Sequence, residues 1–252
     1  LALPMISFVY GNYGFDTLFW LMAGAAALIF VAVACLRFDM AIPLPADRRE
    51  GFGLLFLSLV MILCVSTAIA AFLFLAPPHW LDLLNNPGLL PYLDLVPVAV
   101  AFGGGYQAMQ MWFVREKRFQ NIASSRIQQS SAMAVGQIGL GAVGVIPFGL
   151  IAGQLLNHGV GFAGLFIRTS RGFLDRGLRP TLGEVRALAA SYSRFPRYSV
   201  WEALANAASL NLPLLIIGAF ASGPEVGYLM LAWFLLQVPM ALVGNAVGQV
   251  YL

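Results

Sequence analysis

Charged residues in this chain are confined to a few loops, and the stretches between these loops are too long and too apolar for a soluble fold. Residues 127–167 contain no Lys, Arg, Asp or Glu. A helix needs about 20 apolar residues to cross a bilayer, so this stretch of about 41 residues can form two spans. Pro147 and Gly149 lie near its middle and predict the break between the two helices.

Five further uncharged stretches have the length of a single span, at residues 17–36, 52–76, 95–114, 203–221 and 226–248. Residues 1–10 are interpreted as the end of an earlier helix. Only 10% of the residues are charged and 60% are hydrophobic, whereas soluble domains carry about 25% charge. The sequence therefore predicts an all-α integral membrane protein with about seven full transmembrane helices plus a partial first helix.

The basic residues test this segmentation. If each stretch crosses once, the loops at 37–50, 115–126 and 168–197 share one side of the membrane. All 14 Lys and Arg residues lie in these three loops. The excess of positive charge marks the cytoplasmic side of a membrane protein. We therefore predict a multi-pass membrane protein with these loops in the cytoplasm.

The third basic loop contains a predicted short helix. Thr181 and Glu184 have the spacing of a capping box, and Val185, Leu188 and Tyr192 follow on one helical face. We interpret this segment as a helix at the membrane surface. The predicted organisation is a first transmembrane lobe at 1–168, a basic cytoplasmic linker at 169–198, and the first two helices of a second lobe at 199–252. Both ends of the sequence lie in apolar segments, so we expect a piece of a longer protein.

Several other functions are disfavoured by the same pattern. Cys35 and Cys64 stand in apolar stretches far from any His, which argues against a metal site or a disulfide framework. Residues 139–144 match G-x-G-x-x-G, but no strand precedes them, so they do not indicate a nucleotide site. We expect no enzyme activity, no cofactor and no nucleic-acid partner.

Three groups of residues resemble a known family. They are Arg37-Phe38-Asp39 with Ile42-Pro43-Leu44-Pro45, the segment 118–130, and Phe195-Pro196-Arg197-Tyr198 running into 202–207 and later islands as far as 248–250. Together they resemble the oligosaccharide-flippase (Wzx-like) family of the multidrug/oligosaccharidyl-lipid/polysaccharide exporter superfamily. The resemblance implies a MATE-like bundle of two six-helix lobes that moves a polyprenyl-pyrophosphate-linked oligosaccharide to the periplasmic leaflet by alternating access. Membrane lipids are further expected partners, and polysaccharide polymerases and glycosyltransferases are weighed as others.

An anionic pyrophosphate group calls for cations that face a wet cavity, and arginine suits phosphate because its planar fork makes two hydrogen bonds. Arg37 is the leading candidate for this role, and Asp39 could pair with it. The alternative is that Arg37 only orients the protein in the membrane. Arg115, Lys117 and Arg118 are interpreted as a cytoplasmic basic entrance, and Arg126 as a further substrate contact. Orientation and lipid adhesion could also explain this cluster.

Polar residues inside the spans are the remaining candidates. Glu202 and Asn206 share one helical face and are predicted to point into a cleft, since polar groups in a span are costly unless they face protein or water. Gln237 is a third candidate, for which a hydrogen bond between helices is the alternative. Gln107 and Gln110 are weighed as contacts for sugar hydroxyls. Two rival functions stay open: a multidrug or organic-cation exporter of the same superfamily, and a non-transporting scaffold for polysaccharide assembly.

Overall fold

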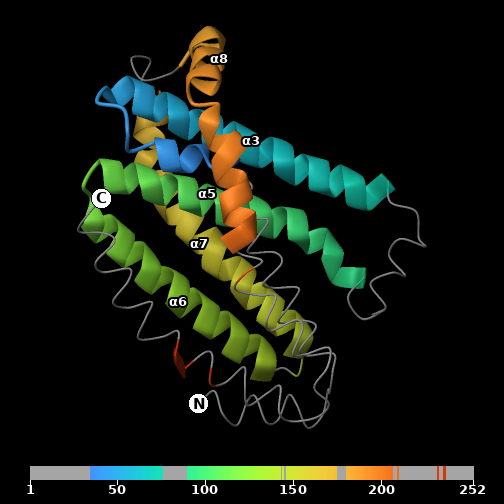
Figure 1. Cartoon of the computed structure of the whole chain (residues 1–252). Helices are drawn as coiled ribbons and strands as arrows, with labels where there is room; N and C mark the ends of the chain where they lie inside the picture. Colours follow the sequence, from blue (N-terminus) through green and yellow to red (C-terminus); the bar gives the residue numbers. More distant parts are fainter. Residues whose placement is uncertain are drawn as a thin grey trace. The chain divides into compact units, whose positions relative to one another are not determined.

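The computed structural model describes residues 35–75, 90–142, 144, 146–174, 180–206 and the single positions 209, 232, 235 and 236. The chain separates into two compact units, Ala26–Leu204 and the combination of Leu1–Ala25 with Ala205–Leu252. Nearly all described residues belong to the first unit. Every regular element in the described ranges is helical (Figure 1), as predicted for an all-α protein.

The first helix pair is α3 (Arg48–Leu75) with α5 (Val96–Arg115), which pack against each other. A short 3-10 turn, η2 (Leu90–Leu95), leads into α5. Both helices agree with the predicted spans at 52–76 and 95–114 to within a few residues. Among the described residues, α3 is the one helix that is long and apolar enough to cross a membrane by its length and composition. The count of seven spans remains a prediction, because most of the stretches 17–36, 203–221 and 226–248 lies outside the described residues.

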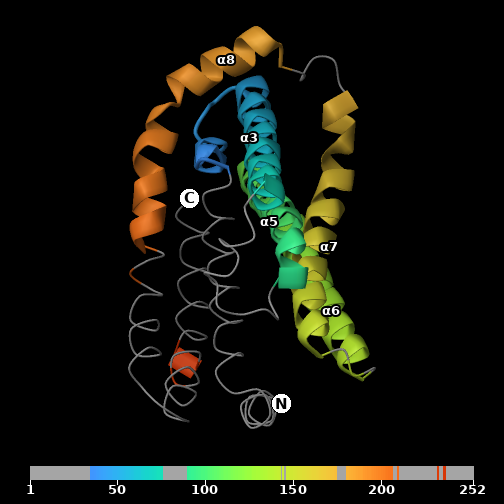
Figure 2. The same ribbon diagram turned by 90° about the vertical axis from the view of Figure 1, so that its right-hand side faces the viewer.

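The second helix pair is α6 (Phe119–Ala142) with α7 (Ile146–Leu174), which lie side by side along their length (Figures 1 and 2). The predicted break between two helices is present, but it precedes Pro147 and does not include it. Gly144 has a φ of 85°, in the left-handed region that glycine adopts readily. Pro147 follows in the first turn of α7, where its missing N–H removes no helical hydrogen bond.

The contact between α6 and α7 is polar and close. A Cβ atom at Gly161 would lie 2.1 Å from Nε2 of Gln129, and one at Gly153 would lie 2.3 Å from Cγ of Gln137. Asn157 also donates a hydrogen bond across the pair, from Nδ2 to the Met133 sulfur at 3.3 Å. Small residues on one helix thus leave room for long polar side chains of the other, as in many membrane helix pairs.

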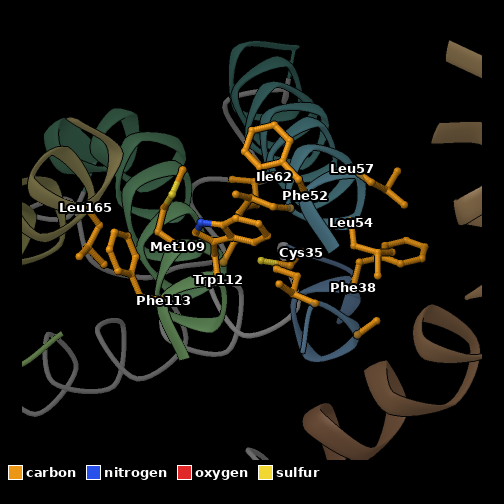
Figure 3. Close-up of a cluster of buried hydrophobic side chains, with 14 of the residues drawn as sticks. Cys35, Phe38, Phe52, Leu54, Leu57, Ile62, Met109, Trp112, Phe113 and Leu165 are labelled. Carbon is orange, nitrogen blue, oxygen red and sulfur yellow. The ribbon is translucent and has the colours of Figure 1, made fainter. Parts of the chain in front are cut away.

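The apolar core lies where α3, α5 and the turn η1 (Phe38–Ala41) meet. Phe52 packs edge to face on Trp112 with ring centroids 5.4 Å apart. Figure 3 shows this pair beside Cys35 and Phe38, which come from the η1 region. The Cys35 thiol lies 3.6 Å from the backbone oxygen of Gly104 and donates a hydrogen bond to it. This core fixes η1 against α5.

The predicted short helix of the linker is α8 (Leu182–Ser191), and its capping box is complete. The Glu184 N–H donates to Oγ1 of Thr181 at 3.3 Å, and the Thr181 N–H donates to Glu184 at 2.8 Å. The predicted apolar face packs on the protein core, since Val185, Leu188 and Tyr192 all join it. A Cβ at Gly53 would meet Leu188 at 2.6 Å, so α8 lies directly on α3.

Two polar contacts attach this helix to the start of α3. Arg49 forms an ion pair with Glu184 at 2.9 Å, and the Tyr192 hydroxyl donates to Oε1 of Glu50 at 3.1 Å. Figure 2 shows α8 across the end of the unit at which α3 begins. The chain then passes through η3 (Phe195–Ser199), a π turn. Pro196 lies at the start of that turn, where its missing N–H removes no helical hydrogen bond.

Candidate functional site

The candidate site is built on an unusual backbone turn. Leu36 and Arg37 have φ angles of 47° and 61°, in the left-handed region. This conformation costs about 1–2 kcal/mol for each residue that has a Cβ atom. Phe38 and Ile42, which follow this turn, are buried, and burying a large apolar side chain contributes about 1.5–3 kcal/mol. Anchoring of this size can offset the strain, so the turn holds Arg37 in one place.

Asp39 is the buried acid of this site. It has no exposed surface, and its Oδ2 accepts a hydrogen bond of 2.7 Å from Nε2 of Gln107 on α5. Its Oδ1 accepts none from the described residues. Burial raises the pKa of the Asp39 carboxyl above its usual value, and the positive charge of Arg37 opposes that rise.

Arg37 is the cation beside this carboxylate. Its side chain is partly buried, and its Nε is buried without a hydrogen-bond partner among the described residues. A guanidinium has five N–H donors, so Arg37 retains donors for an anionic group. Among the described residues no ion pair within 4.0 Å joins Arg37 to Asp39. The charge of Arg37 acts on the carboxylate from a greater distance, and the side-chain hydrogen bond to Asp39 comes from Gln107.

Arg115 has a different role from the other predicted cations. Its guanidinium donates to backbone oxygens in the loop between η1 and α3: to Ile42 at 3.1 Å, Asp47 at 2.7 Å and Ala46 at 3.4 Å, and also to Pro45. The side chain therefore holds this loop on the end of α5. Hydrogen bonds from a charged donor contribute about 1.5–3 kcal/mol each, so these contacts favour a structural role over an open entrance residue.

The other members of the basic cluster are exposed. Lys117 and Arg118 end α5: the Arg118 N–H donates to the Phe113 oxygen at 2.9 Å, and Lys117 takes a left-handed φ of 55°. This is a Schellman C-cap, with lysine where glycine is usual. Arg126 is exposed on α6. The structure therefore does not bring these three cations together with the buried Arg37 and Asp39.

The polar stripe predicted near the end of the described chain is placed only in part. Glu202 and Asn206 are both exposed, and their place in a cleft stays a prediction. Gln237 lies outside the described residues.

Two polar residues of the helices had no partner assigned from the sequence. Gln107 was weighed as a sugar contact, but its side chain holds Asp39. Arg168 on α7 donates to the Asn121 oxygen at 3.2 Å and to Oγ of Ser124 at 2.8 Å, which ties α7 to the start of α6. A polar residue inside an apolar span was the only signal for Gln107, and it does not identify the partner.

The arrangement suits the binding of an anion more than covalent chemistry. Within the described residues, no three His, Cys, Asp or Glu side chains are grouped so as to hold a metal ion. The only partly buried guanidinium with uncommitted donors in these ranges that also faces a buried acid is that of Arg37. Such a group can bind phosphate or carboxylate by charge and by paired hydrogen bonds.

Comparison with known proteins gives one positive result. A family model described as polysaccharide biosynthesis protein matches residues 56–252. Neither the curated proteins nor the solved structures contain a significant match. The match covers α3 from Phe56 onward together with α5, α6, α7 and α8, and begins downstream of Arg37 and Asp39.

Proposed function

Because the chain belongs to the polysaccharide biosynthesis protein family, we propose that it moves a polyprenyl-pyrophosphate-linked oligosaccharide from the cytoplasmic to the periplasmic leaflet of the bacterial inner membrane. The cargo is the repeat unit of an O-antigen, exopolysaccharide or capsule. The family match over residues 56–252 carries this proposal. The confinement of all 14 basic residues to three loops supports a multi-pass topology with a positive cytoplasmic face.

Arg37 is the proposed anchor for the pyrophosphate. It combines a partly buried guanidinium with a turn that is fixed by buried neighbours, and arginine pairs with phosphate through two parallel hydrogen bonds. Lys117, Arg118 and Arg126 are exposed and would attract anionic lipid headgroups toward the membrane surface. Transport of this kind needs binding and a change of access, with no bond made or broken by the protein.

The test is complementation in a bacterial host that lacks its own flippase. The gene that contains this sequence is expressed, and surface polysaccharide and drug resistance are measured together. Restored polysaccharide without drug resistance is the expected result. Drug resistance alone would assign the protein to the multidrug exporters. Normal membrane insertion with neither phenotype, in hosts that supply several different repeat units, would contradict transport and favour a scaffold.

Arg37 is tested in the same assay. Arg37→Ala is expected to leave the amount of inserted protein unchanged and to abolish export, because the pyrophosphate loses its anchor. Arg186→Ala is the matched control: it removes one exposed charge of the basic linker and should change export by less than about twofold, as expected for exposed charges. Normal export by the Arg37→Ala protein would mean that Arg37 serves orientation only.

A further inference from the structure

We propose that Asp39 is a proton-binding site linked to the occupancy of Arg37: when a phosphate group engages the Arg37 guanidinium, the Asp39 carboxylate takes up one proton from cytoplasmic water. When the phosphate leaves, the proton returns to water and Arg37 again neutralises the carboxylate. This inference deepens the proposed function, because it rests on phosphate binding by Arg37. It assigns a chemical role to Asp39 and Gln107 that the family match does not contain.

The first support is the incomplete set of hydrogen bonds around the carboxylate. An ionised carboxylate has about four acceptor sites. The fully buried Asp39 uses Oδ2 for the 2.7 Å bond from Gln107. The backbone N–H groups of Asp39 and Met40 also act on the carboxylate, but Oδ1 has no partner of hydrogen-bond geometry among the described residues. A buried charge with so few donors must be neutralised by a cation or by a proton.

The second support is that Arg37 is the cation acting on Asp39. The thiol of Cys35 is close to both, but it donates to the Gly104 oxygen. The elements packed against η1 are α3, α5 and η3. Most of their charged and titratable side chains are engaged elsewhere or exposed: Arg48 with Glu116, Arg49 with Glu184, Glu50 with Tyr192, Arg115 with loop carbonyls, and Arg197 exposed. The exception is Tyr106 on α5, whose hydroxyl is buried without a hydrogen-bond partner among the described residues.

The third support is the direction of the electrostatic effects. Burial raises the pKa of Asp39, and the charge of Arg37 lowers it again in part. Phosphate that pairs with the guanidinium removes this lowering, so the pKa of Asp39 rises further. Proton uptake and phosphate binding are then linked, and each favours the other. Gln107 stays within hydrogen-bond distance of Asp39 in both states and keeps the carboxyl in place.

The experiment counts protons during binding. Farnesyl pyrophosphate is titrated into the purified full chain by calorimetry, in buffers of different ionisation enthalpy at neutral pH. For each farnesyl pyrophosphate bound, the wild type is expected to take up as much as one proton more than the Asp39→Asn variant, which still binds the ligand. The difference between the proteins cancels protons taken up by the ligand itself. Asp47→Asn, at an exposed acid of the same region, should match the wild type.

Each outcome bears on the inference. Equal proton uptake by wild type and Asp39→Asn would overturn it, while the proposed transport function would stand on the complementation result. If export is restored but the wild type does not bind farnesyl pyrophosphate, the inference is overturned, because Arg37 then does not bind the pyrophosphate. If export also fails, the proposed function is contradicted as well.

A second measurement covers the case in which Asp39→Asn does not fold. Infrared difference spectra of the wild type, with isotope-labelled aspartate, should gain the carbonyl band of a protonated carboxylic acid when the ligand is added. Arg37→Gln should show that band without ligand at neutral pH, because the carboxylate has lost its cation. A spectrum of the wild type without this band after ligand binding would overturn the inference.

Discussion

Gly51 shows how the size of one residue determines the geometry of a distant side chain. A Cβ at this position would lie 2.6 Å from Nε and 2.7 Å from Cζ of Arg115. Arginine is flexible, but this guanidinium is held by the carbonyl oxygens of the loop before α3. It could move aside only by losing some of these hydrogen bonds. Gly51 therefore leaves the space in which Arg115 holds the loop.

Gly51→Ala is expected to lower the free energy of unfolding by about 1–3 kcal/mol, the cost of leaving buried acceptors without donors. The measurement is denaturant unfolding of the purified protein in detergent. Gly183→Ala is the matched control in α8, because nothing lies within 4 Å of its Cβ position and alanine stabilises a helix by up to about 1 kcal/mol relative to glycine. Equal stability of the Gly51→Ala protein and the wild type would contradict the role given to Arg115.

Residue contacts that are local in the chain could be predicted, and those between distant segments could not. Thr181 and Glu184 are three residues apart, so their spacing alone indicates the capping box. Gln107 and Asp39 are separated by 68 residues, and no periodicity relates them. Arg115 was expected at a basic entrance, because composition reveals its charge and not the carbonyl groups that its guanidinium meets.

The pair α6 and α7 depends on close packing between glycine and glutamine. Gly161→Ala is expected to lower the midpoint of thermal unfolding, because the new methyl group would overlap the side chain of Gln129 and overpacking costs about 1–3 kcal/mol. Gln129→Ala in the same protein should recover most of the loss, since it removes the atoms that overlap. Additive losses in the double variant would show that the two residues do not share this contact.

The attachment of α8 should depend on pH in both directions. The hydrogen bond from the Thr181 N–H, and then the charge of Arg49, lower the pKa of Glu184. The stabilisation that ionised Glu184 gives the folded state is present above its unfolded pKa of about 4.3, and it is lost as pH falls through the lower folded pKa. Burial and the hydrogen bond to Glu50 raise the pKa of Tyr192. Its contribution is present below about pH 10 and is lost as pH rises through the higher folded value.

A spin label at the exposed position Ala187 reports on this attachment, because the mobility of the label rises when α8 comes loose from α3. We expect least mobility near neutral pH and more at both extremes. Arg49→Gln should increase mobility at neutral pH, whereas Arg186→Gln, at an exposed arginine on the same helix, should not. Mobility that is the same in both variants would contradict the ion pair as an attachment.

Helix identity was easier to predict than the positions of helix ends. Charge-free length was sufficient for α3, α5 and the pair α6 and α7. The turn between α6 and α7 was expected at Pro147, but proline fits the first turn of a helix, and Gly144 makes the reversal instead. The apolar face of α8 was identified from its spacing. The sequence did not show that this face packs on α3, because the surface of a membrane and the surface of α3 require the same apolar pattern.

At the scale of the whole molecule, the sequence makes a prediction that labelling can check. Single cysteines are placed at exposed Ala46, Ala187 and Ala142 in a variant without Cys35 and Cys64, and intact cells are treated with an impermeant maleimide. Ala142→Cys is expected to react from outside, and the other two only after the cells are opened. Reaction of Ala46→Cys in intact cells would contradict the assignment of the basic loops to the cytoplasm.

The hydrogen bonds of Arg115 also set an order of events during synthesis. Their acceptors lie 68 to 73 residues earlier in the chain, so the loop before α3 is made long before its donor. At about 5–20 residues per second, translation leaves this loop without Arg115 for roughly 4–14 s. The ribosome must therefore deliver the end of α5 before the beginning of α3 reaches its final geometry, and an arrest between the two would leave the loop open.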